Sequence, residues 1–193
     1  MISAILLAAG QSKRMKGKNK LLLKYKRKTL INHVLKSLIK SKVNKIIIVL
    51  GHEDRKIKKI VLKSNKITFA VNSNYLKGIS TSIKCGLKKI SKKNIGFLIA
   101  HADMPLVSKT ILNVLCSALK NKNEEIFIPV YKKRIGNPLA FKYSMIKSLK
   151  RIKGDRGAKK LIRSNKSKIK LMKMKSKSIL IDFDQLKDFP LAT

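Results

Sequence analysis

Short apolar runs alternate along the chain with segments whose apolar residues fall at helical spacing, and this order limits the possible folds more than any other feature. The apolar runs cover residues 1–7, 45–50, 67–71, 96–100 and 126–130, and the helical segments cover residues 29–39, 55–62, 75–90 and 108–119. Uninterrupted apolar runs are typical of parallel strands that are buried on both faces. The alternation predicts an α/β fold: one Rossmann-like, doubly wound, mostly parallel sheet with helices on both faces.

Polar residues near the ends of these segments predict helix starts. Thr29 and Ser80 are the expected N-caps of two helices, and Asp155 opens a helical segment that runs to residue 162. Apolar residues at 178–181 predict a late strand, after which period-two spacing places Asp182 and Asp184 on one face. These two acids can supply a metal contact or cap the last short helix, and the sequence leaves both open. Solvated helix ends are expected for Glu53, Asp54, Glu124 and Glu125, and structural roles for His33 and His101.

Length and composition indicate one domain over residues 1–193. The apolar fraction is 44%, and no run approaches the ~18 apolar residues that a membrane helix needs. The first strand begins at once, without the basic region of a signal peptide. Cys85 and Cys116 stand alone, with neither metal-site nor disulfide spacing. We therefore expect a cytoplasmic protein without a membrane partner.

The formal net charge of +38 makes nucleic acid the first partner to consider. The lysines are spread over the whole chain instead of forming one stripe, and aromatic residues that could stack on bases make up only 5%. These features argue against a specific nucleic-acid partner. Non-specific, salt-sensitive binding to polyanions is expected whatever the function.

The turn after the first strand has the chemistry of a phosphate-binding loop. Small residues leave the backbone accessible, and three cations follow, so that N–H groups and positive charge can converge on a polyphosphate. An ordinary loop in a lysine-rich chain is the alternative, and loop chemistry alone does not decide between them. A Walker A loop is excluded because Gly10 and Gly17 are too far apart, and a dinucleotide fingerprint is absent. The candidate residues are Ala8, Ala9, Gly10, Gln11, Ser12, Lys13, Arg14 and Lys20.

Loops that follow parallel strands lie at one edge of the sheet, where ligands bind in such folds. His52, Asn72 and Asp103 follow the second, third and fourth strands, and His52 is a candidate for contact with a base or sugar. Asp103 can hold Mg²⁺ between its carboxylate and phosphate oxygens, or it can cap the next helix or pair with a lysine. We favour the metal role, because cations alone cannot organise in-line phosphoryl chemistry as a divalent ion does.

Five motifs and a closing acidic motif occur in an order that resembles a known family. They are residues 7–10 with Ser12, Arg14, Met15 and 19–22; residues 78–82 with 86–87; 102–105; 136–138; 154–158; and Asp182, Asp184 and Asp188. Over nearly the whole chain they are similar to the small nucleotidyltransferases that attach a nucleotide to molybdopterin, especially the CTP-using molybdenum cofactor cytidylyltransferases.

The resemblance implies the fold of nucleotide-diphospho-sugar transferases and a set of roles. Residues 8–14 would wrap the phosphates and base of CTP, with Arg14, Lys20 and Asp103 catalytic. Asp103 would bind Mg²⁺, with Asp182 as a second metal ligand. Ser80 belongs to the nucleotide-binding motifs, and Asn137 and Asp155 would face the pterin. Ala9 accompanies cytidine use, whereas a second glycine there accompanies guanosine.

The implied reaction is attack by the terminal phosphate of molybdopterin on the α-phosphorus of CTP, with release of pyrophosphate. A molybdoenzyme or its chaperone would receive the product. The alternatives are GTP as the donor, a sugar phosphate as the acceptor, or a basic nucleic-acid-binding protein on an inactive nucleotidyltransferase fold.

Overall fold

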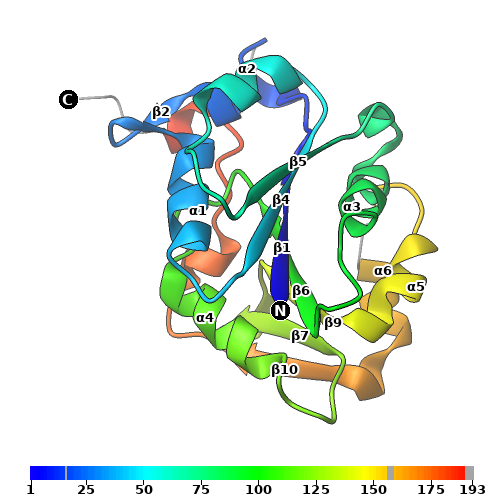
Figure 1. Cartoon of the computed structure of the whole chain (residues 1–193). Coiled ribbons are helices and arrows are strands. Elements are labelled where there is room, and N and C mark those ends of the chain that lie inside the picture. Colours follow the sequence, from blue (N-terminus) through cyan, green and yellow to red (C-terminus); the bar gives the residue numbers. More distant parts are fainter. Residues whose placement is uncertain (16, 156–158, 190–193) are drawn as a thin grey trace.

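A computed structural model describes residues 1–15, 17–155 and 159–189. Its main sheet runs in the order β10-β7-β9-β6-β1-β4-β5, with β8 paired to β7 (Figure 1). The neighbours of β1 are both parallel to it, whereas β9 runs antiparallel between β6 and β7. The strands are β1 Ile2–Ala8, β4 Lys45–Leu50, β5 Ile67–Val71, β6 Gly96–His101, β7 Ile126–Tyr131, β8 Arg134–Ile135, β9 Leu139–Lys142 and β10 Ile169–Lys173, and a separate hairpin pairs β2 Lys24–Tyr25 with β3 Lys28–Thr29.

Helices cover both faces of the sheet, as the alternation predicts. In Figure 1, α1 and α4 lie on one face, and α3, α5 and α6 lie on the other. The helices are α1 Leu30–Ile39, α2 Asp54–Ile60, α3 Ile79–Leu87, α4 Lys109–Ala118, α5 Ile146–Lys150 and α6 Lys159–Ser164. Within the described ranges, no helix is long and apolar enough to span a membrane. The predicted fold class is confirmed.

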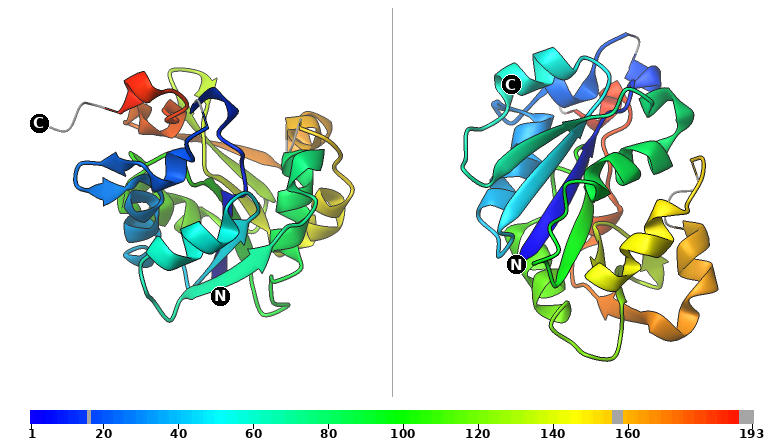
Figure 2. Two further views of the ribbon diagram at one scale, coloured as in Figure 1. Left: turned by 90° about the horizontal axis from the view of Figure 1, so that it is seen from above. Right: turned by 45° about the vertical axis from the view of Figure 1, so that its right-hand side comes forward.

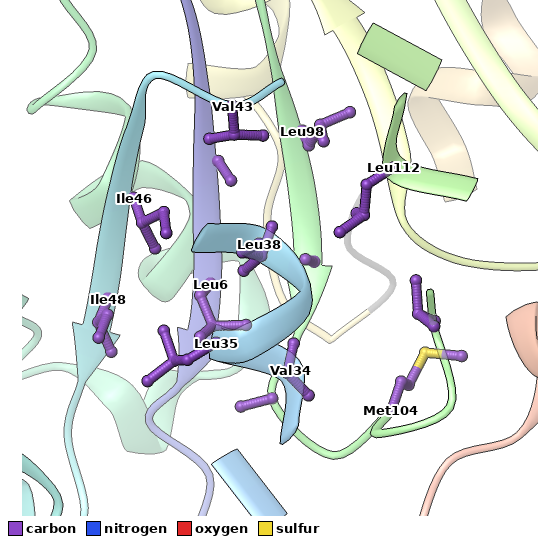
Figure 3. Close-up of a cluster of buried hydrophobic side chains, with 14 of the residues drawn as sticks. Leu6, Val34, Leu35, Leu38, Val43, Ile46, Ile48, Leu98, Met104 and Leu112 are labelled. Atoms are coloured by element: carbon purple, nitrogen blue, oxygen red, sulfur yellow. The ribbon is translucent and has the colours of Figure 1, made fainter. Parts of the chain in front are cut away.

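Two hydrophobic clusters hold these layers together, one on each side of the sheet. Leu6 of β1 belongs to the cluster under α1 and α4, whereas its neighbour Ile5 belongs to the cluster under α3 and α5. Figure 3 shows Leu35 and Leu38 of α1 over Leu6, with Ile48 of β4 beside them. Both faces of β1 are therefore buried, which explains its uninterrupted apolar sequence. The hydrophilic turn that follows β1 is held on a rigid strand.

Several sequence predictions are wrong in detail. The late strand at 178–181 is instead a 3-10 helix, η6 Lys177–Leu180, whose N-cap Ser176 accepts a hydrogen bond from the Ser178 N–H. The N-cap of α3 is Gly78, at φ 97°, and Ser80 lies inside the helix. Glu124 and Glu125 precede strand β7 instead of ending a helix. Segments as short as these permit either structure locally, so long-range packing decides.

Other predicted helix ends have the expected position but different bonding. Thr29 occupies the N-cap of α1, yet its hydroxyl accepts a bond from the Asn32 amide (2.8 Å) instead of capping the backbone. Glu53 and Asp54 begin α2, with Glu53 at the left-handed φ of 51°. The remaining 3-10 turns are η1 Lys13–Met15, η2 Lys20–Leu22, η3 Tyr75–Lys77, η4 Tyr143–Met145, η5 Lys166–Lys168 and η7 Leu186–Asp188.

Candidate active site

A cavity of about 500 Å³ opens at the carboxyl ends of β1 and β6. Seen from above in Figure 2 (left), the loop after β1 runs between the red C-terminal segment and α3. The cavity is lined by residues from the end of β1 and the loop after it, the 3-10 turn and helix α3 at 75–82, the end of β6, and single acids from the segments after α5 and before the C-terminus: Leu7, Ala8, Ala9, Gly10, Gln11, Ser12, Lys13, Arg14, Lys20, Leu21, Tyr75, Leu76, Gly78, Ile79, Ser82, His101, Asp103, Asp155 and Asp184. The loops thus meet at one edge of the sheet.

The loop after β1 is closed on itself, which fixes the position of Lys20. Ser12 adopts a left-handed φ of 54°, and its hydroxyl accepts a hydrogen bond from the Lys20 N–H (3.1 Å). The fully buried Met15 anchors the middle of the loop in the core. Asn19 accepts a bond from the Leu21 N–H (3.1 Å) and begins the 3-10 turn that carries Lys20. The hydroxyl of Ser12 is therefore used for loop closure.

Lys20 is the centre of the charged part of the cavity. Its Nζ lies 2.6 Å from Asp103 Oδ2 and 2.5 Å from Asp184 Oδ1. The Arg14 guanidinium lies 3.1 Å from the other oxygen of Asp184. Burial by itself lowers the pKa of Lys20, but the charges and hydrogen bonds of Asp103 and Asp184 outweigh it and raise the pKa above its ordinary value. The hydrogen bond from Lys20 lowers the pKa of Asp184, with burial opposing.

The C-terminal segment brings Asp184 to this cluster. Phe183 is buried, packs edge-on against Tyr25 and Phe189, and donates its N–H to the carbonyl of Asp103 (2.9 Å). Asp188 Oδ2 accepts bonds of 2.7 Å from the N–H groups of Asp184 and Gln185. Gln185 is the N-cap of η7, so the suggested capping role of Asp182 or Asp184 is wrong. Because Lys20 and Asp184 are 164 residues apart, their pairing depends on tertiary structure.

Asp155 closes the opposite side of the cavity. Its carboxylate accepts a hydrogen bond from the N–H of Ile79, the first residue of α3 (3.2 Å). A Cβ added to Gly78 would stand 2.5 Å from that oxygen, so glycine is required here both for its positive φ and for space. The carboxylate of Asp155 thus binds the start of α3, and that it also caps the helical segment after it stays a prediction. Residues 156–158 of the same motif lie outside the described residues.

Five residues predicted for the site do not line this cavity: His52, Asn72, Ser80, Asn137 and Asp182. Asn72 is buried behind the wall, where its amide donates to the hydroxyls of Thr81 (2.9 Å) and Ser82 (3.0 Å). Ser80 is buried too, and its helix neighbour Ser82 lines the cavity in its place. His52 lies beside Tyr75, with ring centroids 6.4 Å apart.

A second hollow of about 190 Å³ adjoins the first cavity through His101 and Asp103, which line both. It contains Asn137, Asp182 and Arg134. Asp103 therefore stands between two spaces, with the phosphate-type loop on one side and Asn137 on the other. Tyr75 and Ser82 line the cavity but were not predicted as site residues. Ser82 could have been found because it belongs to the motif at 78–82, whereas no motif includes Tyr75.

The donor set of the charged cluster suits a hard divalent cation. Asp103 and Asp184 offer carboxylate oxygens that already share one cationic partner, Lys20. Mg²⁺ is commonly bound by one or two carboxylates together with substrate phosphates and waters, so these residues fit such an ion. Among the residues that the structure describes, no group of three or more His, Cys, Asp or Glu side chains forms a closed metal site. A phosphate-bearing ligand would therefore have to complete the coordination.

A doubly wound sheet with a cationic loop after its first strand and a strand-end carboxylate opposite is a nucleotide-binding α/β architecture. Residues 4–169 match the model of the family described as the MobA-like NTP transferase domain. The chain therefore belongs to this family, and the protein is an enzyme of the nucleotidyltransferase type.

Relatives in this family differ in their substrates. The chain is 25% identical over 138 residues to the molybdenum cofactor cytidylyltransferase of Escherichia coli (72% of this chain, 68% of the relative). It is 34% identical over 132 residues to a probable molybdenum cofactor guanylyltransferase of Natranaerobius thermophilus (67% and 60%). It is 30% identical over 138 residues to a probable UDP-N-acetylglucosamine pyrophosphorylase of Acanthamoeba polyphaga mimivirus (69% and 52%). The match thus spans about half to two thirds of these relatives.

Solved structures share the fold. Rv0371c from Mycobacterium tuberculosis H37Rv is 23% identical, with a TM-score of 0.85 over 97% of this chain and 94% of its own. A structure of Rv0371C in complex with manganese is 20% identical, with a TM-score of 0.74 over 90% and 88%.

Proposed function

We propose that the enzyme transfers CMP from CTP to the terminal phosphate of molybdopterin and releases pyrophosphate. The observation that carries this proposal is the Lys20 ammonium held between Asp103 and Asp184 at the junction of two hollows. One hollow can receive the nucleotide, and the other can receive the acceptor phosphate. Asp103 is then adjacent to both reacting groups.

The larger cavity is cationic on the side of the loop, whereas its other side is mainly apolar and includes the Asp155 carboxylate bound to the Ile79 N–H. Lys13, Arg14 and Lys20 supply the cations on the side of the loop, where the triphosphate would bind. Apolar and small side chains line the other side, together with the Ser82 hydroxyl, and this is the place for the nucleoside: Ala9, Tyr75, Leu76, Gly78 and Ile79. A pocket that is largely apolar with a few polar groups is typical of small-molecule sites.

Asp103 and Asp184 are the residues that would hold Mg²⁺ in this proposal. Asp182, the second ligand suggested by the motif, lies in the smaller hollow, so we assign the second position to Asp184. When bound, the ion would neutralise charge on the phosphate oxygens and orient them. The similarity to a fold that has been crystallised with manganese supports a divalent ion.

The chain's own residues would act by positioning and charge neutralisation. An ionised phosphate monoester attacks the α-phosphorus without a general base, forming a new phosphorus–oxygen bond while the bond to pyrophosphate breaks. Lys20 and Arg14 would stabilise the negative charge that moves to the pyrophosphate oxygens. The hollow beside Asn137 would orient the acceptor for in-line attack. Asp155 would keep the start of α3, and with it the nucleoside end of the cavity, in place.

Selection of CTP is proposed from Ala9, which accompanies cytidine use in the family that the motifs resemble. The test is a thermal unfolding series with CTP, GTP, ATP and UTP, each with and without Mg²⁺, followed by a pyrophosphate-release assay with molybdopterin. A ligand at ~100 times its Kd adds roughly 2.7 kcal/mol. We expect a CTP-selective, Mg²⁺-dependent shift that Asp103→Ala abolishes. Equal, salt-sensitive shifts with all four nucleotides would contradict the proposal.

A sugar phosphate is the second candidate acceptor, favoured by the similarity to the probable UDP-N-acetylglucosamine pyrophosphorylase. The same pyrophosphate assay with a hexose 1-phosphate replacing molybdopterin separates the two. A cytoplasmic location and transfer of the product to a molybdoenzyme or its chaperone are further parts of the molybdopterin proposal.

A further inference from the structure

The charged cluster is electrically balanced in the free protein. Asp184 accepts a hydrogen bond from Lys20 (2.5 Å) with one carboxylate oxygen and from Arg14 (3.1 Å) with the other. Asp103 accepts a second hydrogen bond from Lys20 (2.6 Å). Arg14 and Lys20 are thus matched by two carboxylates, beside Lys13, the third loop cation that lines the cavity. We propose that the Asp184 carboxylate competes with the triphosphate for Lys20 and Arg14. Asp184 would thus exclude a bare polyphosphate and would admit one only when a divalent ion neutralises the charge of Asp184.

This proposal rests on the proposed function for the location of the triphosphate, but not on the identity of base or acceptor. A phosphate oxygen that binds Lys20 or Arg14 has to displace Asp184 or share the cation with it. Sharing places two anions close together in a partly buried site, where the Lys20 side chain is 14% exposed and solvent screens less than at the surface. Either route costs free energy that a bare polyphosphate does not recover.

The backbone of Asp184 is held close to the cations. Asp188 holds the backbone N–H of Asp184, and the buried Phe183 ties the preceding residue to the carbonyl of Asp103. Neutralising Asp103 and Asp184 together would release Lys20 and Arg14 for phosphate oxygens without moving this segment. The device would make polyphosphate and divalent ion bind with positive coupling.

The need for such selection follows from the net charge. A chain of +38 attracts every polyanion, and that long-range attraction fades beyond a Debye length of ~10 Å at 0.1 M salt. Discrimination therefore has to come from contacts inside the cavity. Asp184 supplies it because its carboxylate touches the two cations that would otherwise bind any phosphate chain.

The test measures binding of inorganic tripolyphosphate by calorimetry, in EDTA and in Mg²⁺, at fixed ionic strength. In EDTA we expect Asp184→Asn to bind about 10-fold more tightly than the wild type, a difference of ~1.4 kcal/mol. Asp182→Asn is the matched control. It removes the same charge two residues before Asp184, and the Asp182 side chain makes no ion pair with Lys20 or Arg14 within the described residues. It should change the affinity less than about 2-fold, since exposed charges contribute little. In Mg²⁺ the gain should disappear.

An equal gain in both variants would show bulk electrostatics and overturn the proposal, as would an unchanged or weaker affinity of Asp184→Asn in EDTA. Asp184→Ser should bind tripolyphosphate like Asp184→Asn. If the unfolding midpoint shows that one of these two variants is misfolded, the other still tests the proposal. The proposed transferase reaction can fail separately: no pyrophosphate release with any acceptor, while the tripolyphosphate difference persists, would refute that reaction alone.

Discussion

Replacing Lys20 by Met should separate the structural role of this residue from its catalytic role. The variant keeps the length of the side chain but leaves Asp103 and Asp184 facing each other without their shared cation. Removing one partner from a fully buried ion pair costs about 3–5 kcal/mol. Here the carboxylate side chains are 20% and 35% exposed, so water takes over part of the lost interaction. We expect a loss of about 1–2 kcal/mol in the free energy of unfolding.

That loss corresponds to a decrease of about 2–8 °C in Tm for a chain of this size. Added Mg²⁺ should raise the Tm of Lys20→Met more than that of the wild type, because the ion no longer competes with an ammonium for the two carboxylates. Turnover in the pyrophosphate-release assay should nevertheless fall by ~10²–10³ or more, because a charge that stabilises the transition state is gone. The variant would thus gain more stability from Mg²⁺ than the wild type does, although it has lost turnover.

Lys18→Met is the matched control, since it removes the same charge from an exposed position of the same loop. It should leave Tm, the Mg²⁺ response and turnover close to those of the wild type. If Lys20→Met unfolds at the wild-type temperature and retains turnover within about 3-fold, Lys20 holds neither the carboxylates nor the transition state, and the charge argument for this site is refuted.

Three further variants probe the other parts of the site. Asp103→Asn should lower turnover by at least ~10², measured by pyrophosphate release; near-normal turnover would remove it from the mechanism. The lowered pKa of Asp184 means that its stabilising effect is present above its ordinary pKa of 3.8 and is lost as pH falls through the lower folded value. The difference in urea midpoint between wild type and Asp184→Asn should therefore shrink on acidification, and a constant difference would contradict this. Gly78→Ala should cost more stability than Gly154→Ala, because both positions have positive φ but only the first would clash with Asp155. Equal urea midpoints would show that the clash relaxes.

The strands could be located from the sequence where each strand is buried on both faces. Residues in β1, β4 and β6 form unbroken apolar runs because each contacts helices on both sides, so their sequences are distinctive. Strand β10 mixes lysines with apolar residues without strict alternation, and β9 has only four residues, so neither stands out from a loop. The antiparallel insertion of β9 between β6 and β7 depends on pairing between distant segments, which local periodicity does not contain.

The site divides in the same way. The loop after β1 and Asp103 could be predicted as parts of the site, because each follows a parallel strand and such loops meet at the carboxyl edge of the sheet. The choice between Asp182 and Asp184 could not be made, since a late strand would have given both the same direction. Because η6 is a 3-10 turn and Phe183 is anchored in the core, Asp184 lies in the larger cavity and Asp182 in the smaller hollow. The bond between Asp155 and the start of α3 could not be predicted, because the two residues are 76 positions apart in the chain.

The few acids of this chain explain how a strongly basic protein can contain a selective site. Of nine acidic residues, three line the main cavity: Asp103 and Asp184 pair with Lys20 and Arg14, and Asp155 binds the start of α3. The 47 basic residues determine how strongly any polyanion is attracted, an effect that salt screens. In our proposal Asp103 and Asp184 determine which polyanion stays, through contacts of 2.5 and 2.6 Å with Lys20 that salt screens far less. Raising the salt concentration should therefore weaken binding of all phosphates while increasing the ratio by which the Mg²⁺-bound nucleotide is preferred.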